Sequence, residues 1–236
     1  MKIKALYLKS AIELCSRINP DIFIYQDKDK LVFQVISEDN SSLLQCDIIS
    51  NITKSDKVIY FPSSKIRNIL SAASNDDNIE IIVKDEYILF KLNNITRTVR
   101  LTFPDKPRFV FPDERTKEQL VFTHDIDLFK DELVNTLIAS NDLTTDLTIN
   151  IKDNKLELKK EDNVDEFSSI LKNIKVNKSK ESISNRYNSD FIYQIVSKAK
   201  DKIKMQLSQD APIKFTNQLY RNFTFKHMVA PLSKLD

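Results

Sequence analysis

The chain repeats part of its own pattern about half its length further on. The segments "DKDKLVFQVISED" (27–39) and "IKDNKLELKKED" (151–162) each place a turn-forming cluster of Asp, Asn and Lys before Lys-Leu, and each closes on Glu-Asp. Between these ends, apolar and polar residues alternate, which is typical of a β-strand. Each segment therefore predicts a turn followed by the second strand of a hairpin.

Three further pairs of segments correspond in the same order. Helical spacing of apolar residues precedes each hairpin, at 10–18 and 128–139, and recurs at 63–74 and 188–200. Alternating segments follow at 78–92 and 202–216. The offset between equivalents stays nearly constant: 126 for Ile66/Ile192, 125 for Leu31/Leu156 and 124 for Ile79/Ile203. Chance similarity between amphipathic segments would explain one pair, but four ordered pairs indicate a duplicated domain.

The order of elements in each copy predicts an α+β fold. Each domain is expected to be an antiparallel sheet with two helices on one face. We place the N-terminal domain at 1–102, a connector at 103–118 and the C-terminal domain at 119–236. The connector holds three prolines, which suit an extended segment. It also holds the adjacent Phe109, Val110 and Phe111, so these apolar residues are expected on a domain surface or against a partner.

The 236 residues include no glycine. Backbone positions with positive φ must then be filled by Asn and Asp, which tolerate this conformation best among the other residues. The absence also excludes the phosphate-binding loops and nucleophile turns that depend on glycine. Several large classes of enzyme are therefore improbable.

Cys15 and Cys46 lie in apolar stretches without metal-ligand spacing. Buried thiols in a reducing compartment are the favoured interpretation, and a disulfide is the alternative. With neither a signal-peptide pattern nor a run of 18 apolar residues, we expect an intracellular protein without a membrane span. Lys and Arg number 36 against 34 acidic residues, a net charge of +2 that neither indicates nor excludes nucleic-acid binding.

No catalytic pattern is present. His124 and His227 lie in unrelated contexts, and no Ser or Cys has a nucleophile motif around it. The acidic pairs Asp76-Asp77 and Glu161-Asp162 are expected in turns as solvated charge rather than as a metal site. We therefore expect no catalytic residue, no metal and no cofactor, and an unrelated enzyme is the contrasting hypothesis.

Several motifs resemble the DNA sliding clamps of the proliferating cell nuclear antigen (PCNA) family. "NILSAASNDDNIEI" (68–81) is similar to the family's second helix and the strand after it, "LSQDAPIKF" (207–215) to a late hairpin, and "KHMVAPL" (226–232) to the C-terminal strand. The chain departs from the family in lacking its glycines and in having no acidic tail after "LSKLD". The departures leave the expected fold intact but leave the loop geometry open.

The resemblance implies a non-catalytic processivity factor for DNA replication and repair. Three two-domain chains would form a ring of about six domains, with helices lining a hole through which duplex DNA passes. DNA polymerase, flap nuclease, ligase and the clamp loader would dock outside through short apolar peptides. A homotrimer and a subunit of a heterotrimeric or checkpoint-type clamp both remain open. The location would be cytoplasmic in a prokaryote and nuclear in a eukaryote.

The resemblance also implies site residues. Basic residues on the helices would face DNA: Lys9, Arg17, Lys65, Arg67, Lys198 and Lys200. The pattern alone leaves this open, because ordinary solvated helix faces look much the same. Apolar residues would form the partner-peptide groove: Ile36, Val110, Phe111, Pro212, Met228, Ala230 and Pro231. For Ile36 and Met228, a place in the core is an equal alternative. Subunits would join by pairing roughly 96–102 with 168–175 of a neighbour.

Overall fold

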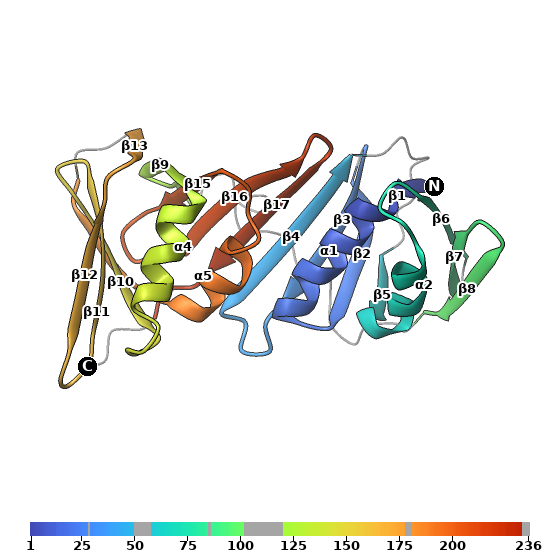
Figure 1. Cartoon of the computed structure of the whole chain (residues 1–236), viewed down its shortest axis with the longest axis horizontal. Coiled ribbons are helices and arrows are strands. Elements are labelled where there is room, and N and C mark those ends of the chain that lie inside the picture. The colour runs from blue at the N-terminus through green and yellow to red at the C-terminus, as the bar shows by residue number, and fades with distance from the viewer. Residues whose placement is uncertain (28, 50–57, 85, 102–119, 178–180, 233–236) are drawn as a thin grey trace. The chain divides into compact units, whose positions relative to one another are not determined.

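The chain forms two compact units in the computed structural model, which describes residues 1–27, 29–49, 58–84, 86–101, 120–177 and 181–232 (Figure 1). The first unit comprises Met1–Glu38, Leu44–Phe109 and Tyr220–Phe225. The second comprises Asp39–Leu43, Val110–Leu219 and Lys226–Asp236. The expected connector, 103–118, lies outside the described residues.

The first unit begins with a short strand and a long helix, and continues with two groups of strands separated by a short helix. Its elements are β1 (Lys2–Lys4), α1 (Ala5–Ile18), β2 (Asp21–Asp27), β3 (Lys30–Ile36), β4 (Ser42–Ile49), β5 (Ile59–Pro62), the 3₁₀-helix η1 (Ser63–Ile66), α2 (Arg67–Ala72), β6 (Asn78–Val83), β7 (Tyr87–Leu92) and β8 (Ile95–Arg100).

Among the described residues, the second unit follows the same order with one more strand, although Tyr220–Phe225, around the turn between its last two strands, belong to the first unit. Its elements are β9 (His124–Phe129), α4 (Lys130–Ala139), β10 (Asp146–Lys152), β11 (Lys155–Glu161), β12 (Glu166–Leu171), β13 (Ile174–Asn177), β14 (Ile183–Asn188), α5 (Ser189–Val196), β15 (Lys202–Leu207), β16 (Ile213–Tyr220) and β17 (Phe223–Val229).

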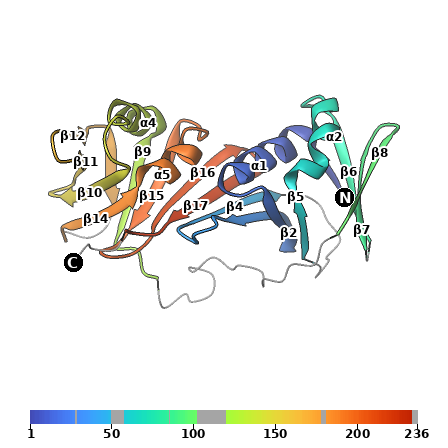
Figure 2. The ribbon, with the colours of Figure 1, turned by 90° about the horizontal axis from the view of Figure 1, so that it is seen from below.

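Neighbouring strands pair antiparallel, for example β2 with β3 and β10 with β11. In the first unit, β1-β6-β7-β8 form one sheet and β4-β3-β2-β5 lie side by side in a second. In the second unit, β12-β11-β10-β14 form one sheet and β13-β9-β15-β16-β17 lie side by side in another. In each unit the helices lie on one face of the strands, as Figure 2 shows. The predicted α+β class with two similar domains is therefore confirmed.

The duplication repeats the core. Every residue of six equivalent pairs is buried: Leu31/Leu156, Ile66/Ile192, Ile69/Ile195, Leu70/Val196, Ala73/Ala199 and Ile79/Ile203. The repeated sequence pattern therefore marks the positions that pack helices onto sheets, where a change of volume is costly.

Asparagine and aspartate take the place of glycine in the backbone. Among the described residues, positive φ angles occur only at Asn40, Asn93, Asp153, Asn154, Asp201 and Asp210. The prediction made from the missing glycines is therefore confirmed.

Two helix ends differ from the predicted bounds, and tertiary hydrogen bonds account for the first of them. Helix α1 begins at Ala5 rather than residue 10, because the amides of Ala5 and Leu6 donate to the carbonyls of Asp77 and Asn75, at 2.7 and 3.2 Å. These bonds satisfy two of the amides that a helix start leaves without a partner.

Helix α5 ends at Val196 rather than residue 200, because the amides of Lys198 and Ala199 bond carbonyls three residues back. The predicted second helix also begins differently, as a 3₁₀ turn over Ser63–Ile66. Such tight turns are common at helix ends.

Cys15 and Cys46 are buried free thiols, which agrees with the favoured interpretation rather than the disulfide. Burial raises the pKa of the Cys46 thiol. In the described part of the chain, no helix is long and apolar enough to cross a membrane. The described residues also contain no cluster of His, Cys, Asp or Glu suited to a metal ion.

Candidate functional site

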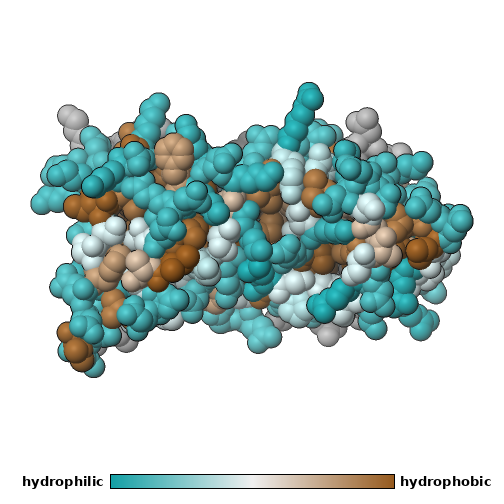
Figure 3. Space-filling model, viewed as in Figure 1, coloured by the Kyte–Doolittle hydropathy of each residue, from teal (hydrophilic) through white to brown (hydrophobic). Residues whose placement is uncertain are grey.

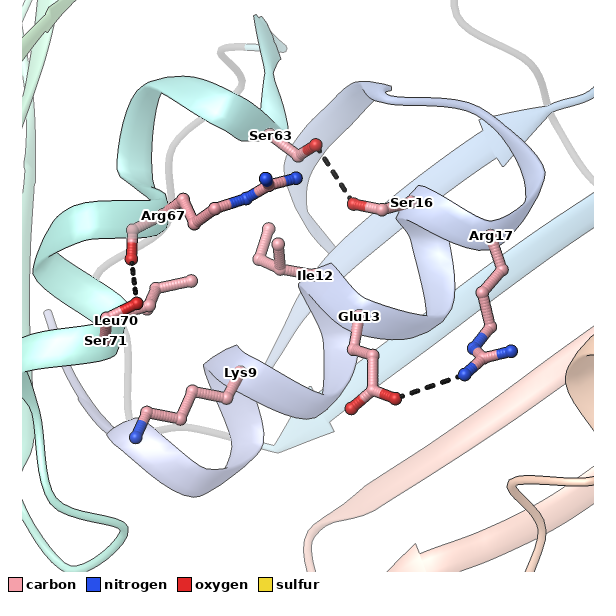
Figure 4. Close-up of a pocket in the computed structure, with 9 residues that line it drawn as sticks. All are labelled: Lys9, Ile12, Glu13, Ser16, Arg17, Ser63, Arg67, Leu70 and Ser71. Carbon is pink, nitrogen blue, oxygen red and sulfur yellow. Dashed lines mark hydrogen bonds and ion pairs between the residues drawn. The ribbon is translucent and has the colours of Figure 1, made fainter.

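A groove on the helix face of the first unit gathers half of the predicted DNA-facing residues. It has a volume of about 490 Å³ and lies between α1 and the η1–α2 segment (Figure 4). We call it the helix groove, and its lining residues are Lys9, Ile12, Glu13, Ser16, Arg17, Ser63, Arg67, Leu70 and Ser71. Helical spacing places the α1 members of this set one turn apart along the same wall.

The floor of the helix groove is apolar and its walls are polar. Ile12 and Leu70 are buried beneath it. The hydroxyl of Ser16 donates to the Ser63 hydroxyl across the groove at 3.0 Å, which joins α1 to η1. Burial of the apolar pair and this bond together hold the two walls in place.

The three cationic side chains of the helix groove differ in how closely they contact other groups of the protein. Lys9 Nζ donates to the carbonyl of Ala73 at 2.5 Å, and Arg17 Nη2 lies 3.4 Å from Glu13 Oε1. The guanidinium of Arg67 extends from α2 toward α1 (Figure 4). Three cations against one carboxylate make the groove weakly positive, and Arg67 is its most available cation.

A further cation joins this face from a strand, where the sequence analysis did not place one. Arg97 of β8 donates from Nε to the carbonyl of Lys65 at 3.1 Å. Strand alternation puts Arg97 on the same face as the buried Val99. This alternation is the sequence signal from which Arg97 could have been placed on the helix face. Lys65 itself is exposed but does not line the helix groove.

The helix face of the second unit has a different chemistry. Lys198 and Lys200 are exposed just after α5. The first turn of α4 is acidic, and Lys130 there lies 3.3 Å from Asp131. Large apolar side chains are also exposed in this unit: Phe129 at the end of β9, Ile138 on α4 and Tyr193 on α5. Brown patches between teal residues are visible on the helix-bearing face in Figure 3.

Part of the predicted peptide groove is brought together in the second unit. The C-terminal segment after β17 pairs with β14, through a bridge between Pro231 and Tyr187. The amide of Leu232 donates to the carbonyl of Arg186 at 2.8 Å. The Tyr187 hydroxyl donates to the carbonyl of Ala211, next to Pro212, also at 2.8 Å. Pro212, Ala230 and Pro231 are all partly exposed around this junction.

Asn185 and Tyr187 are the residues that the sequence analysis missed here. Asn185 Nδ2 donates to the Ser208 carbonyl at 2.7 Å, and its Oδ1 accepts from the Asp210 amide at 2.9 Å. Asn185 therefore fixes the β15–β16 turn against β14. Burial raises the pKa of Tyr187 to about 12.

The remaining predicted groove residues differ in exposure, and two of them lie outside the described part of the chain. Ile36 is partly exposed in the first unit, and its carbonyl accepts from Asn19 Nδ2 at 3.0 Å. Met228 is only 4% exposed, as expected for the alternative in which it is a core residue. Val110 and Phe111 lie outside the described residues.

Three solved structures that share this fold are PCNA structures. PCNA from Entamoeba histolytica superposes with a TM-score of 0.82 at 16% identity, over 98% of each chain. A. fulgidus PCNA with the C-terminal region of FEN-1 bound gives 0.81 at 15% identity, over 100% of this chain and 98% of that one. PCNA from Thermococcus kodakaraensis gives 0.82 at 14% identity, over 98% of each chain.

The amino-acid sequence itself matches no protein-family model and no curated protein. The likeness therefore lies in the fold over nearly the full length of the chain, and the fold is that of PCNA, as the sequence motifs implied.

Proposed function

We propose that this protein is a sliding clamp, which encircles duplex DNA as a trimeric ring and tethers replication and repair enzymes without catalysing a reaction. The observation that carries the proposal is the PCNA fold across 98–100% of the chain. The likeness therefore covers both units in the same order, as in a whole clamp subunit, and is not limited to a single shared domain.

The helix groove supports DNA as the ligand. Its cations are few, and two of them already bond to protein groups. Weak phosphate contacts suit a protein that must move along DNA, because each tight contact would have to break at every step. A ring needs little affinity, since the closed topology keeps the DNA inside.

Short peptides of DNA polymerase, flap nuclease, ligase and the clamp loader are the proposed partners. The structure of A. fulgidus PCNA with the C-terminal region of FEN-1 supports this class of ligand. In this chain, the partly exposed Pro212, Ala230 and Pro231 form the described part of the docking surface. We extend the proposal to Ile36, Val110, Phe111 and Met228 as its other members, and to a cytoplasmic or nuclear location.

The second candidate function is that of one subunit in a heterotrimeric or checkpoint-type clamp. The exposed Phe129, Ile138 and Tyr193 on the second unit favour it, because these side chains are unlike a phosphate-binding surface. In that case the purified chain would form rings only with other subunits.

Retention on DNA in high salt tests the clamp proposal. The protein, with its clamp loader and ATP, is loaded onto nicked circular DNA, and retention is measured before and after the circle is cut. A ring should remain on the circle at a salt concentration that removes direct binding, and it should leave the linear product. Binding by charge alone would weaken equally on circular and linear DNA as the salt concentration rises, because salt cations compete for the phosphates. Equal retention on both would overturn the proposal.

A further inference from the structure

The first half of α1 is bonded to the segment that follows α2. The first two backbone amides of α1 donate to the carbonyls of Asp77 and Asn75, at 2.7 and 3.2 Å. Lys9 Nζ then donates to the carbonyl of Ala73 at 2.5 Å. The three bonds advance along α1 while they go back along the other segment, so they form one continuous contact. Lys9 is thus the last member of a series whose other members are backbone bonds.

A second side-chain bond joins α1 to the segment before α2. The Ser16 hydroxyl donates to the Ser63 hydroxyl at 3.0 Å, and Ser63 is the first residue of η1. Ala73, which accepts the bond from Lys9, directly follows the last residue of α2. The two side-chain bonds therefore hold opposite ends of the η1–α2 segment. Arg67, the first residue of α2, lies between them (Figure 4).

Helix α2 depends on such bonds for its orientation. It has six residues, and a helix this short is not stable by itself. Its last turn contains no basic residue. The carbonyls at the end of a helix carry a partial negative charge, which a nearby cation stabilises. The ammonium of Lys9 supplies that cation from another helix, so its removal would leave α2 free to shift.

The second unit begins the same contact without the lysine. The Lys130 amide, at the start of α4, donates to the Asp201 carbonyl at 2.7 Å, as the first amide of α1 does to its own partner. This bond aligns the two helices residue by residue. Four residues further along, the first unit has Lys9 and the second has Val134. Val134 is buried and has no polar group in its side chain.

The second unit also lacks the arginine. Ile66 and Ile192 are equivalent in the duplication, and the residue that follows is Arg67 in the first copy and Tyr193 in the second. The lysine and the arginine are therefore present together in one copy and absent together from the other. This joint difference is expected if the lysine serves the arginine.

We propose that Lys9 is a positioning residue, which together with Ser16 holds α2 so that Arg67 meets a DNA phosphate, and that Lys9 makes no phosphate contact itself. The inference rests on the proposed function and replaces the DNA-facing role that the sequence implied for Lys9. To reach a phosphate, Lys9 would have to leave the Ala73 carbonyl for a solvent-exposed ion pair, and such pairs contribute little.

A double-mutant cycle on DNA affinity tests the positioning role. The purified full-length chain is titrated onto a short labelled duplex, and fluorescence anisotropy is measured over a series of salt concentrations. Each phosphate contact contributes about 0.9 to the slope of log affinity against log salt concentration. Arg67→Gln should lower the slope by about one contact. Adding Lys9→Gln to Arg67→Gln should lower it no further, because Lys9 acts through Arg67.

Ser16→Ala tests positioning without a change of charge. It should weaken DNA binding by about twofold to threefold when Arg67 is present, because one of the two bonds that hold α2 is lost. It should have no effect in the Arg67→Gln protein. Lys155→Gln removes an exposed lysine from a hairpin of the second unit and is the charge control, with an expected change of slope below about 0.2. Circular dichroism checks that each variant is folded at the temperature of the assay.

The inference and the clamp proposal fail in different ways. A double variant that loses about two contacts of slope would overturn the positioning role and return Lys9 to the DNA-facing residues. Equal weakening by Ser16→Ala with and without Arg67 would also overturn it. A cycle in which Lys9 acts only through Arg67, combined with equal retention on circular and linear DNA, would overturn the clamp and leave the positioning role in direct DNA binding.

Discussion

At the scale of single residues, the chain shows how turns form without glycine. Asp153 and Asn154 are the two-residue loop between β10 and β11, and both have positive φ, 50° and 60°. This is the conformation of a type I′ turn, for which Asn, Asp and Gly are preferred. A β-branched side chain at such a position clashes with the following carbonyl oxygen.

Asn154→Val should therefore lower the free energy of unfolding by about 1–2 kcal/mol. Asn154→Gly should leave it within about 0.5 kcal/mol of the original, because glycine adopts positive φ without steric cost. Urea unfolding followed by circular dichroism measures both. Asn163→Val is the control, because Asn163 is exposed and has no positive φ. Equal losses for the valine variants at 154 and 163 would contradict the account.

The buried His227 gives a second prediction at this scale. Its Nε2 lies 2.9 Å from the Ser42 hydroxyl, and burial lowers the pKa of His227 to about 3. The unfolded chain, with a pKa near 6.5, binds the proton more readily, so stability falls as the pH drops below about 6.5.

Between pH 7 and pH 5, protonation of this histidine in the unfolded chain should lower the free energy of unfolding by about 2 kcal/mol. The His227→Gln variant should not show this part of the decrease. The measurement is the difference in unfolding free energy between the two pH values, for each protein. Carboxylates elsewhere contribute equally to both proteins and cancel. An unchanged difference in the variant would show that His227 does not carry the effect.

At the scale of elements, the segment after β17 is the accessible part of the proposed peptide surface. Ala230 is partly exposed, while Met228 is buried, so only Ala230 can be given a charge without a large folding cost. The Ala230 amide also ties this segment to the Ser41 carbonyl at 2.7 Å, and a substitution of the side chain leaves that bond in place.

Ala230→Glu should therefore weaken binding of an apolar helical peptide with two aromatic anchors by about tenfold or more, since a charge beside the pocket must be desolvated. Fluorescence anisotropy of a labelled peptide measures this, and light scattering checks that assembly is intact. Ser184→Glu is the control, because Ser184 is an exposed residue at the start of β14, before Tyr187. Full binding by the Ala230 variant would place the groove elsewhere.

At the scale of the whole molecule, the two duplicated units have kept their cores but not their surface charge. The first unit gathers Lys9, Arg17 and Arg67 around the helix groove. The second places Lys198 and Lys200 beside an acidic α4 and exposed apolar residues. The first unit should therefore contribute more to the attraction of DNA.

Arg17→Gln with Arg67→Gln should slow loading onto DNA by about threefold to tenfold at low salt, through weaker steering. Lys198→Gln with Lys200→Gln removes the same charge and should slow loading less. Neither pair should shorten residence on a circle, since topology rather than contact holds the ring. Loading rates and residence times by surface-tethered circular DNA separate the two effects. Equal slowing by both pairs would contradict the unequal roles of the units.

Sequence alone determined the elements of local pattern: the duplication, the helix-and-hairpin order, the buried equivalent positions and the use of Asn and Asp at positive φ. These follow from periodicity and backbone sterics, which act between near neighbours. Tertiary structure decided which distant groups meet. Only folding could bring Asp77 to the start of α1, Tyr187 to Ala211, Arg97 to Lys65 and Met228 into the core. Those contacts join residues far apart in the chain, and their energies depend on a packing that no short segment encodes.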